Sequence, residues 1–239
     1  MITRLSTSVT MPAPSPQRSH KEAASASTAI AAGIDLGGTK IETQVFDPHW
    51  QVIARQRVTT PTDYNNLLDA LAAQIHWADQ QADTTAATPL PMGVGVPGLI
   101  HPATGIAVTA NICATGRALP ADLEVLAGRR VTFLNDCRAT ALSEVKFGAG
   151  QQHRTVLALI LGTGIGGGVA VNGELLLGAT LTGGEFGHLG APASLLHKHQ
   201  LPLVNCGCGA VACIENYVSG TGMSRIAEAL TGTPVAHSK

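Results

Sequence analysis

Short apolar runs separated by turn residues dominate residues 30–96 of the chain. Runs of this length, rich in Ile, Val and Ala, predict β-strands over residues 30–34, 40–46, 51–58 and 92–96. Between the second and third of these runs, Asp47-Pro48 predicts a hairpin turn. The stretch 65–81 instead carries Leu68, Leu71 and Ile75 at helical spacing, which predicts a helix with one apolar face.

The second half of the chain repeats this arrangement. Strands are predicted over residues 130–134, 156–161, 168–171 and 174–177, and a helix over residues 139–147. Further helices are expected to begin near Glu215 and after Ser219. Because a glycine-rich turn and a strand meander recur in both halves, we predict an α/β fold of two similar lobes, residues 29–134 and 135–239, with a cleft between them.

Residues 1–28 differ from the rest in composition. They are rich in Ser, Thr, Ala and Pro, and Glu22 is their first acidic residue. Such a segment buries too little apolar surface to offset its ordering entropy, so we expect a disordered tail. A misplaced start codon or a Ser-rich, acid-poor transit peptide are the alternatives, whereas the apolar core of a secretory signal is missing.

Overall composition narrows the classes of function. The 239 residues carry a formal net charge of −1 with no long run of either sign, which disfavours broad binding to nucleic acid or to a membrane surface. No apolar stretch is long enough to span a bilayer. Three of the five cysteines lie within eight residues, which favours a metal cluster over a disulfide framework and leads us to expect a cytoplasmic protein.

Two glycine-rich loops each follow a predicted buried strand. The first is Asp35-Leu36-Gly37-Gly38-Thr39-Lys40 and the second is Gly162-Thr163-Gly164-Ile165-Gly166-Gly167-Gly168. Glycine lets backbone N–H groups approach an anion with no side chain in the way. Tight turns also use glycine, but two such loops in one domain-sized chain favour two half-sites that close on one polyphosphate.

The dipeptide Asn135-Asp136 stands at the carboxyl end of a predicted strand, where open α/β sheets place their ligands. An Asp in such a cleft can act as a general base toward a sugar hydroxyl. The simpler alternative is a helix N-cap, because Asn and Asp are favoured there. Both roles are compatible, since a cap position also directs a side chain into the cleft.

Cys206, Cys208 and Cys213 supply three thiolate ligands in a short loop. Structural zinc sites use four ligands, and histidine is a natural fourth. Upstream, His188, His197 and His199 are all candidates, and proximity in sequence favours His199. The alternative is that the three cysteines are reduced and pack as small apolar groups.

The segment 183–188, Gly-Gly-Glu-Phe-Gly-His, combines exposed backbone with polar side chains, which suggests contacts with a polar ligand. Glu215 follows Cys213 closely, so a bound metal would fix its position. A carboxylate held in this way either binds sugar hydroxyls or faces solvent.

Taken together, these motifs resemble the ROK family of sugar kinases, repressors and related proteins over nearly all of the chain after residue 33. The resemblance rests on both glycine loops, Asn111, Asn135-Asp136, the segment 93–98 (Gly-Val-Gly-Val-Pro-Gly), the segment 185–188 and the cysteine loop through Tyr217. Within the family, the pattern is most similar to bacterial N-acetyl-D-glucosamine kinases. It implies an actin-like, ribonuclease-H-like fold of two lobes and transfer of a phosphoryl group from ATP to the 6-hydroxyl of N-acetyl-D-glucosamine.

The resemblance also implies roles for individual residues. Asp136 is the implied catalytic base, and Asp35 is expected to help place Mg²⁺ through water. The implied sugar ligands are Asn111, Asn135, Glu185, His188 and Glu215. The implied zinc ligands are His188, Cys206, Cys208 and Cys213. Backbone groups expected to hold the ATP phosphates come from Gly33, Ile34, Asp35, Leu36, Gly37, Gly38, Thr39 and Lys40, and from Gly162, Thr163, Gly164, Ile165, Gly166, Gly167, Gly168 and Val169.

Three departures from the family pattern affect these expectations. Family members continue for several tens of residues beyond the counterpart of Lys239, so a C-terminally truncated chain of low stability and activity is expected. Cys137-Arg138 replaces a usual Ala-Asn, and Arg138 is expected either to pair with Asp136 and lower its pKa or to point away. Ala212 replaces a usual glycine, so the turn there is expected to avoid a positive φ.

Several alternatives to an N-acetylglucosamine kinase stay open. One is a fructokinase or glucokinase of the same family, and another is a sugar-binding remnant with impaired catalysis. A DNA-binding sugar sensor is disfavoured because residues 1–28 are too short for a helix-turn-helix domain. A zinc module for nucleic acid is disfavoured by the near-neutral charge and the scarcity of aromatics. No membrane partner is expected, and family kinases are often homodimers.

Overall fold

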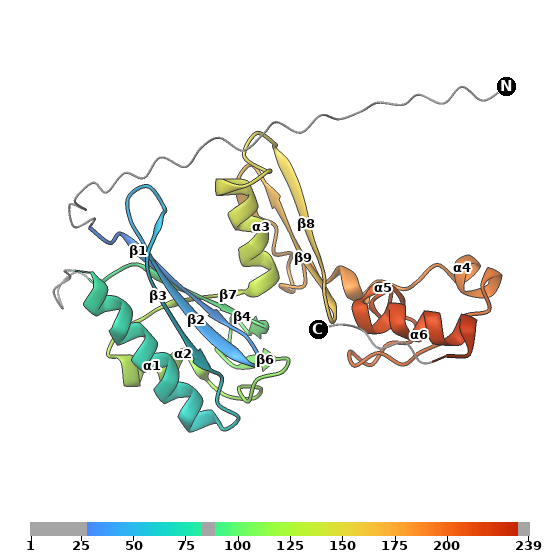
Figure 1. Cartoon of the computed structure of the whole chain (residues 1–239), viewed down its shortest axis with the longest axis horizontal. Helices are drawn as coiled ribbons and strands as arrows, with labels where there is room; N and C mark the ends of the chain where they lie inside the picture. Colours follow the sequence, from blue (N-terminus) through green and yellow to red (C-terminus); the bar gives the residue numbers. More distant parts are fainter. Residues whose placement is uncertain (1–27, 83–88, 234–239) are drawn as a thin grey trace.

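The computed structural model describes residues 28–82 and 89–233, and the predicted N-terminal tail lies almost wholly outside them. The first half is built on a five-stranded sheet with the order β3-β2-β1-β4-β7 (Figure 1). Strands β1 to β3 form an antiparallel meander, whereas β4 and β7 run parallel to β1. Their bounds are Ala31–Leu36 (β1), Lys40–Phe46 (β2), Val52–Thr59 (β3), Met92–Val96 (β4) and Thr132–Asn135 (β7).

Helices α1 (Tyr64–Gln81) and α2 (Leu119–Ala127) cover one face of this sheet (Figure 1). The predicted helix over 65–81 therefore exists. It begins where the side chain of Asp63 accepts hydrogen bonds from the N–H groups of Asn65 and Asn66, which satisfies two free donors of its first turn. Helix α2 was not predicted. The main core lies between these helices and the sheet, and its fully buried members include Leu36, Ile41, Leu67, Leu71, Ile75, Leu119 and Leu123.

Two short strands leave the sheet after β4. They are β5 (Gly98–Ile100) and β6 (Ala107–Thr109), which pair with each other in a separate hairpin. Gly98 adopts φ 149°, and a Cβ there would lie 2.2 Å from the carbonyl oxygen of Val108. Only glycine fits this close crossing, so Gly98 fixes how the chain turns away at the end of β4.

The second half begins with helix α3 (Asp136–Phe147) and a sheet with the order β10-β9-β8. Its strands are β8 (Thr155–Leu161), β9 (Ile165–Val171) and β10 (Glu174–Leu175). Strand β9 starts at Ile165, three residues before the predicted start at residue 168. The prediction missed these residues because the glycines there form no apolar pattern. Instead they let α3 pack closely: a Cβ on Gly166 would lie 2.2 Å from Cys137 Sγ, and one on Gly168 would lie 2.6 Å from Ala141 Cβ.

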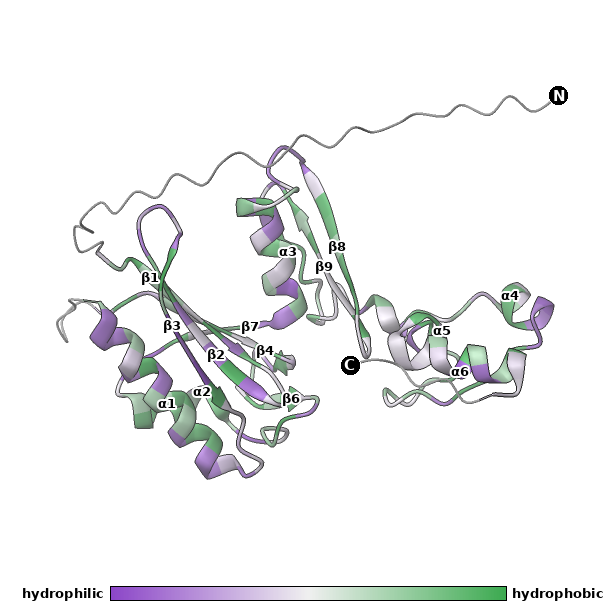
Figure 2. Cartoon of the chain, in the orientation of Figure 1, coloured by the Kyte–Doolittle hydropathy of each residue, from purple (hydrophilic) through white to green (hydrophobic). Residues whose placement is uncertain are grey.

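Strand β8 lies at the edge of this sheet and carries leucine at alternate positions. Leu157, Leu159 and Leu161 are 58%, 48% and 60% exposed. Figure 2 shows the same strand as a continuous apolar stretch. The outward face of β8 is therefore apolar and uncovered by the part of the chain described here.

The remaining elements lie apart from the five-stranded sheet, beyond the turn of β8 and β9 (Figure 1). They are the 3₁₀ helix η1 (Phe186–His188), α4 (Ala193–Lys198), α5 (Glu215–Val218) and α6 (Gly220–Thr231). Ser219 caps α6, as its hydroxyl accepts a hydrogen bond of 3.1 Å from the N–H of Gly222. None of the helices described combines the length and apolar character needed to cross a membrane.

Candidate functional site

Parallel strands place two carboxylates at one edge of the first sheet. Strand β4 pairs Gly95 with Asp35 of β1 and pairs Val96 with Asn135 of β7, so all three strands end side by side. Asp136 follows directly and is half-buried. A Cβ on Gly95 would lie 3.8 Å from Asp136 Cα, so the start of α3 lies within van der Waals distance of β4.

Burial and neighbouring charges act on the Asp35 carboxylate. Desolvation by the surrounding protein raises the pKa of Asp35, and the charges of Asp136 and Glu42 raise it further, while Lys40 lowers it. Asp35 is nevertheless exposed to solvent. A cation placed beside Asp35 and Asp136 would relieve their repulsion.

Asn135 acts as the N-cap of α3, which confirms the structural alternative for this dipeptide. Its Oδ1 accepts a hydrogen bond of 3.1 Å from the N–H of Arg138, and its Nδ2 donates one of 3.1 Å to the carbonyl oxygen of Gly98. Asp136 is the first residue of the helix, and its Oδ1 accepts a hydrogen bond of 2.8 Å from the N–H of Cys137. Capping by Asn135 thus fixes the backbone from which Asp136 projects.

The first glycine loop is the hairpin turn between β1 and β2. The N–H of Gly37 donates to the carbonyl oxygen of Lys40, and the Thr60 hydroxyl donates to the carbonyl oxygen of Gly37 over 2.7 Å. Gly38 faces Asn111, because a Cβ there would lie 2.9 Å from both the Cβ and the backbone oxygen of Asn111. Asn111 itself adopts φ 62°. The turn and Asn111 are therefore in contact.

The second glycine loop is shorter than the sequence suggested. Only residues 162–164 form a turn, while Ile165, Gly166, Gly167, Gly168 and Val169 lie in β9 and pair with β8. The turn is held from the far side by the start of α6, because the N–H of Gly220 donates to Gly162 O over 2.8 Å and the Thr221 hydroxyl donates to Thr163 O over 3.0 Å. Sequence reasoning missed these two supports, because they join residues 58 positions apart in the chain.

Glu215 lies against this second turn. Its Oε2 accepts a hydrogen bond of 2.7 Å from the N–H of Ile165. A Cβ on Gly164 or on Gly187 would lie 2.7 Å or 3.3 Å from the same oxygen, so both glycines make room for the carboxylate. The structure thus shows Glu215 bracing the turn with one of its oxygens.

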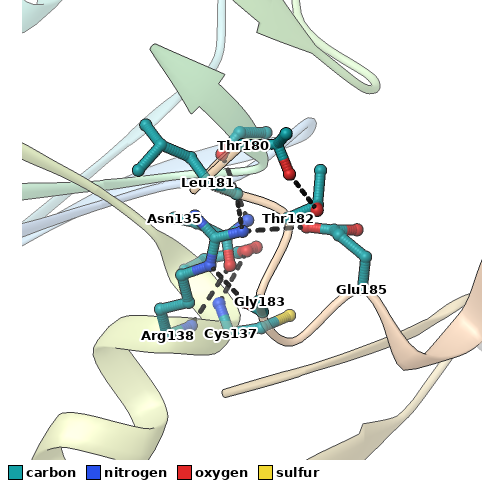
Figure 3. Close-up of polar contacts among 10 residues, drawn as sticks. Asn135, Cys137, Arg138, Thr180, Leu181, Thr182, Gly183 and Glu185 are labelled. Carbon is teal, nitrogen blue, oxygen red and sulfur yellow. Dashed lines mark hydrogen bonds and ion pairs between the residues drawn. The ribbon is translucent and has the colours of Figure 1, made fainter. Parts of the chain in front are cut away.

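Arg138 points away from Asp136, the second of the two orientations considered above. Figure 3 shows its guanidinium directed at the segment 181–185, where it contacts the Glu185 carboxylate and two carbonyl oxygens. Gly183 and Leu181 supply those oxygens. Arg138 therefore belongs to the support of the Glu185 loop and not to an ion pair with Asp136.

His188 and the three clustered cysteines meet in space. Their candidate ligand atoms all lie within 4.8 Å of one another. The Sγ of Cys206 is 3.5 Å from His188 Nδ1, and the Sγ of Cys208 is 3.6 Å from that of Cys213. Tetrahedral zinc with ordinary bond lengths gives edges of roughly 3.6 Å between N and S and roughly 3.8 Å between two S atoms. The four residues therefore fit a structural zinc site. The histidine ligand is His188, as the family resemblance implied, and not His199, which sequence proximity favoured.

Next to this cluster, Ala212 adopts φ 58°. The expectation that alanine keeps this turn out of the positive region is therefore wrong. The carbonyl oxygen of Ala212 accepts a hydrogen bond of 2.8 Å from the N–H of Ala191, and its own N–H donates to Val204 O over 2.8 Å. These bonds hold the residue in the left-handed conformation even though it has a Cβ.

Residues 31–237 match the family model described as the ROK family. The chain belongs to this family. Among its relatives, the N-acetylgalactosamine kinase AgaK of Shewanella sp. (strain ANA-3) is 43% identical over 84% of this chain and 64% of its own length. The N-acetyl-D-glucosamine kinase of Yersinia enterocolitica is 44% identical over 80% of this chain and 63% of its own length.

A solved ROK structure shares the fold. The ROK family glucokinase from Streptomyces griseus, crystallised with glucose and AMPPNP, superposes with a TM-score of 0.66 at 31% identity and covers 82% of this chain and 59% of its own. This confirms the α/β, actin-like ATPase fold expected from the sequence. The ROK chain described here spans just under two thirds of the length of the two kinases it was compared with above.

Proposed function

We propose that this chain phosphorylates N-acetyl-D-glucosamine at the 6-hydroxyl, with ATP as the phosphoryl donor. The observation that carries the proposal is the placement of Asp136, half-buried at the start of α3, on the same sheet edge as Asp35 and next to the strand that follows the second glycine turn. Its relatives named as kinases of N-acetylhexosamines support the class of substrate.

In this proposal, Asp136 accepts the proton of the 6-hydroxyl while the hydroxyl oxygen attacks the γ-phosphorus of ATP. The bond from phosphorus to the β,γ-bridging oxygen breaks, and ADP leaves with that electron pair. Backbone groups of residues 33–40 and 162–169 hold the phosphates. Within these two ranges, residues 37–39 and 162–164 form turns, and the other residues lie in strands. Asp35 would help to hold Mg²⁺, whose positive charge would offset that of the neighbouring Asp35 and Asp136 carboxylates.

Sugar hydroxyls are bound by Asn111, Asn135, Glu185, His188 and Glu215 in this proposal. Glu215 has one carboxylate oxygen engaged in bracing the backbone, which leaves Oε1 for the sugar. Asn135 uses both Oδ1 and Nδ2 for one backbone hydrogen bond each, so its second amide hydrogen and the second lone pair of Oδ1 remain for the sugar. His188 lies 3.5 Å from Cys206 through Nδ1, so Nδ1 serves the metal and Nε2 faces the sugar.

Zinc at His188, Cys206, Cys208 and Cys213 would brace this side of the site by fixing the loop that precedes Glu215. All five cysteines are free, and thiolate ligands persist where the environment is reducing, so we propose a cytoplasmic location. A homodimer stays a prediction from the family resemblance.

A coupled ADP-release assay over N-acetylglucosamine, N-acetylgalactosamine, N-acetylmannosamine, glucose and fructose tests the proposal. N-acetylgalactosamine is the second candidate, because one relative at 43% identity carries that name. Turnover should be highest with N-acetylglucosamine. Binding of a sugar without turnover would favour a sugar-binding chain that lacks catalysis, and neither binding nor turnover would reject the proposal.

The role of Asp136 is tested with Asp136→Asn, which keeps the size of the side chain. Loss of a general base lowers kcat by about 10² to 10⁴-fold. Sugar affinity measured by calorimetry should stay within about threefold of that of the unmodified chain, which corresponds to a change in binding free energy of at most about 0.65 kcal/mol. The matched control is Asp69→Asn on the exposed side of α1, which should leave kcat unchanged. Equal kcat in both variants would exclude Asp136 as the base.

A further inference from the structure

Arg138 is a buried cation whose side-chain hydrogen bonds, in the described part of the chain, go to one loop. Its side chain is 4% exposed. Nε donates a hydrogen bond of 3.0 Å to Gly183 O, while Nη2 donates to Leu181 O and lies 3.3 Å from Glu185 Oε1 (Figure 3). Three acceptors from five consecutive residues thus converge on one guanidinium.

The segment 181–185 is not held by close packing alone. Leu181 adopts φ 56°, a region that costs energy for a residue with a Cβ. Beneath it lies a cavity of about 100 Å³, lined by Ile100, Phe133, Leu177, Leu181 and Arg138 among others. A strained residue beside a void needs directional bonds to stay in place. Arg138 supplies charge-assisted bonds to the carbonyl oxygens of Leu181 and Gly183, in addition to the bond from the N–H of Leu181 to Gly178 O within the loop's own backbone.

On its other side the same segment lies close against β9 and against the residue that follows β10. A Cβ on Gly184, which adopts φ 103°, would lie 2.4 Å from Gly167 O, and one on Gly183 would lie 2.4 Å from Leu176 O. The loop is therefore confined between the strand and the guanidinium. Glu185 emerges from it with 33% of its side chain exposed, paired with Arg138 through Oε1. Its Oε2 can then accept a hydrogen bond from a ligand.

We propose that Arg138 is a positioning residue for the sugar, acting through Glu185. The inference rests on the proposed function, in which Glu185 binds sugar hydroxyls. Arg138 is too buried to reach the sugar itself, but it fixes both the backbone that carries Glu185 and one of its two carboxylate oxygens. Because α3 carries Asp136 and Arg138 two residues apart, one helix start sets the position of the base and of the sugar ligand.

The kinetic test compares Arg138→Ala and Arg138→Lys with Arg130→Ala. Arg130 is the matched control, since its side chain is 85% exposed and pairs only with Glu124 among the described residues. Arg138→Ala should raise the KM for the sugar at least tenfold and leave the KM for ATP within twofold. Lysine should restore part of this, because one ammonium serves fewer of the three acceptors than a planar guanidinium. An unchanged sugar KM, or an equal rise in both KM values, would overturn the inference.

A second measurement does not depend on turnover. Amides within the loop are hydrogen-bonded, including Gly183 N–H to Leu177 O and Glu185 N–H to Thr182 O. In the ligand-free chain, Arg138→Ala should speed hydrogen exchange of residues 181–186 at least tenfold and leave peptides from β1 to β4 unchanged. Arg138→Lys should show a smaller increase. Equal exchange in the unmodified and Arg138→Ala chains would refute the positioning role.

The two measurements separate the inference from the function on which it rests. If the unmodified chain turns over no sugar while Arg138→Ala still loosens residues 181–186, the proposed function fails and the anchoring of the loop stands. If the chain is active and the Glu185→Gln variant loses sugar affinity, adding Arg138→Ala to that variant should raise the KM for the sugar by less than a further threefold. A full additional tenfold loss there would mean that Arg138 does not act through Glu185.

Discussion

Packing of α3 on β9 depends on glycines that have no room for a side chain, and Gly166→Ala tests this directly. The added Cβ would lie 2.2 Å from Cys137 Sγ and 3.1 Å from Cys137 Cβ. Ordinary contact begins near 3.5 Å, so the sulfur or the strand must move by about 1.3 Å. Overpacking of this kind typically costs about 1–3 kcal/mol, and we expect about 2 kcal/mol here.

Urea unfolding followed by circular dichroism measures this cost. In a Cys137→Ala background the sulfur is absent and only the 3.1 Å contact to Cβ remains, so the same Gly166→Ala change should cost less than about 1 kcal/mol. Gly190→Ala is the control, because a Cβ at Gly190 meets no atom within 4 Å. It should change stability by no more than about 0.5 kcal/mol, or raise it slightly. An equal cost of Gly166→Ala in both backgrounds would refute the reasoning.

Four further predictions follow from single sites. Ala212→Gly should raise the free energy of unfolding by about 1 kcal/mol, because glycine adopts φ 58° without strain, and a loss of stability would contradict this. The pKa of Asp35 is raised in the folded chain, so the contribution of Asp35 to the free energy of unfolding falls as the pH rises above 3.8. The difference in stability between Asp35→Asn and the unmodified chain should therefore shift in favour of Asp35→Asn as the pH is raised from 3 to 7. A difference that does not change with pH would contradict this. Burial raises the pKa of Cys137 to about 12, so iodoacetamide at pH 8 should modify it at least tenfold more slowly than in urea, as judged by mass spectrometry. Purified chain should carry about one zinc ion by atomic absorption, and Cys208→Ser should lower that content; equal content would exclude the cluster as the ligand set.

The sequence predicted best the elements whose side chains alternate or recur clearly. Strands β2 and β4 have the predicted bounds, and α1 begins one residue early, because each carries a regular apolar pattern beside strong turn residues. Strand β9 begins earlier than predicted because Gly166, Gly167 and Gly168 have no side chains to form a pattern. The short elements β5, β6 and α4 were not predicted, because a segment of three to six residues is too short to show a periodic apolar pattern.

Contacts between distant residues were harder to predict than elements. Sequence proximity alone favoured His199 beside the cysteines, whereas the family resemblance implied His188. The structure brings His188 there, because the pairing of Gly190 with Cys213 folds the chain back on itself. The sequence left two orientations open for Arg138, toward Asp136 or away from it, and named no partner for the second, whereas its partners in the structure lie 43 to 47 residues away. Such pairings depend on how α3 is rotated on β9, and no local pattern encodes that rotation.

The two glycine turns have similar sequences but are supported by different neighbouring elements. The turn of β1 and β2 lies within a sheet in which β1 has a partner on each side, β2 and β4. Strand β8 lies at the edge of its sheet in the described residues, with three leucines exposed, so the hairpin of β8 and β9 relies on α3, Glu215 and the start of α6. Because α3 also carries Asp136, any change that loosens α3 from β9 displaces the proposed base and the second turn together. Loss of activity in Gly166→Ala should therefore exceed what a change in nucleotide binding alone produces, with kcat falling along with ATP affinity.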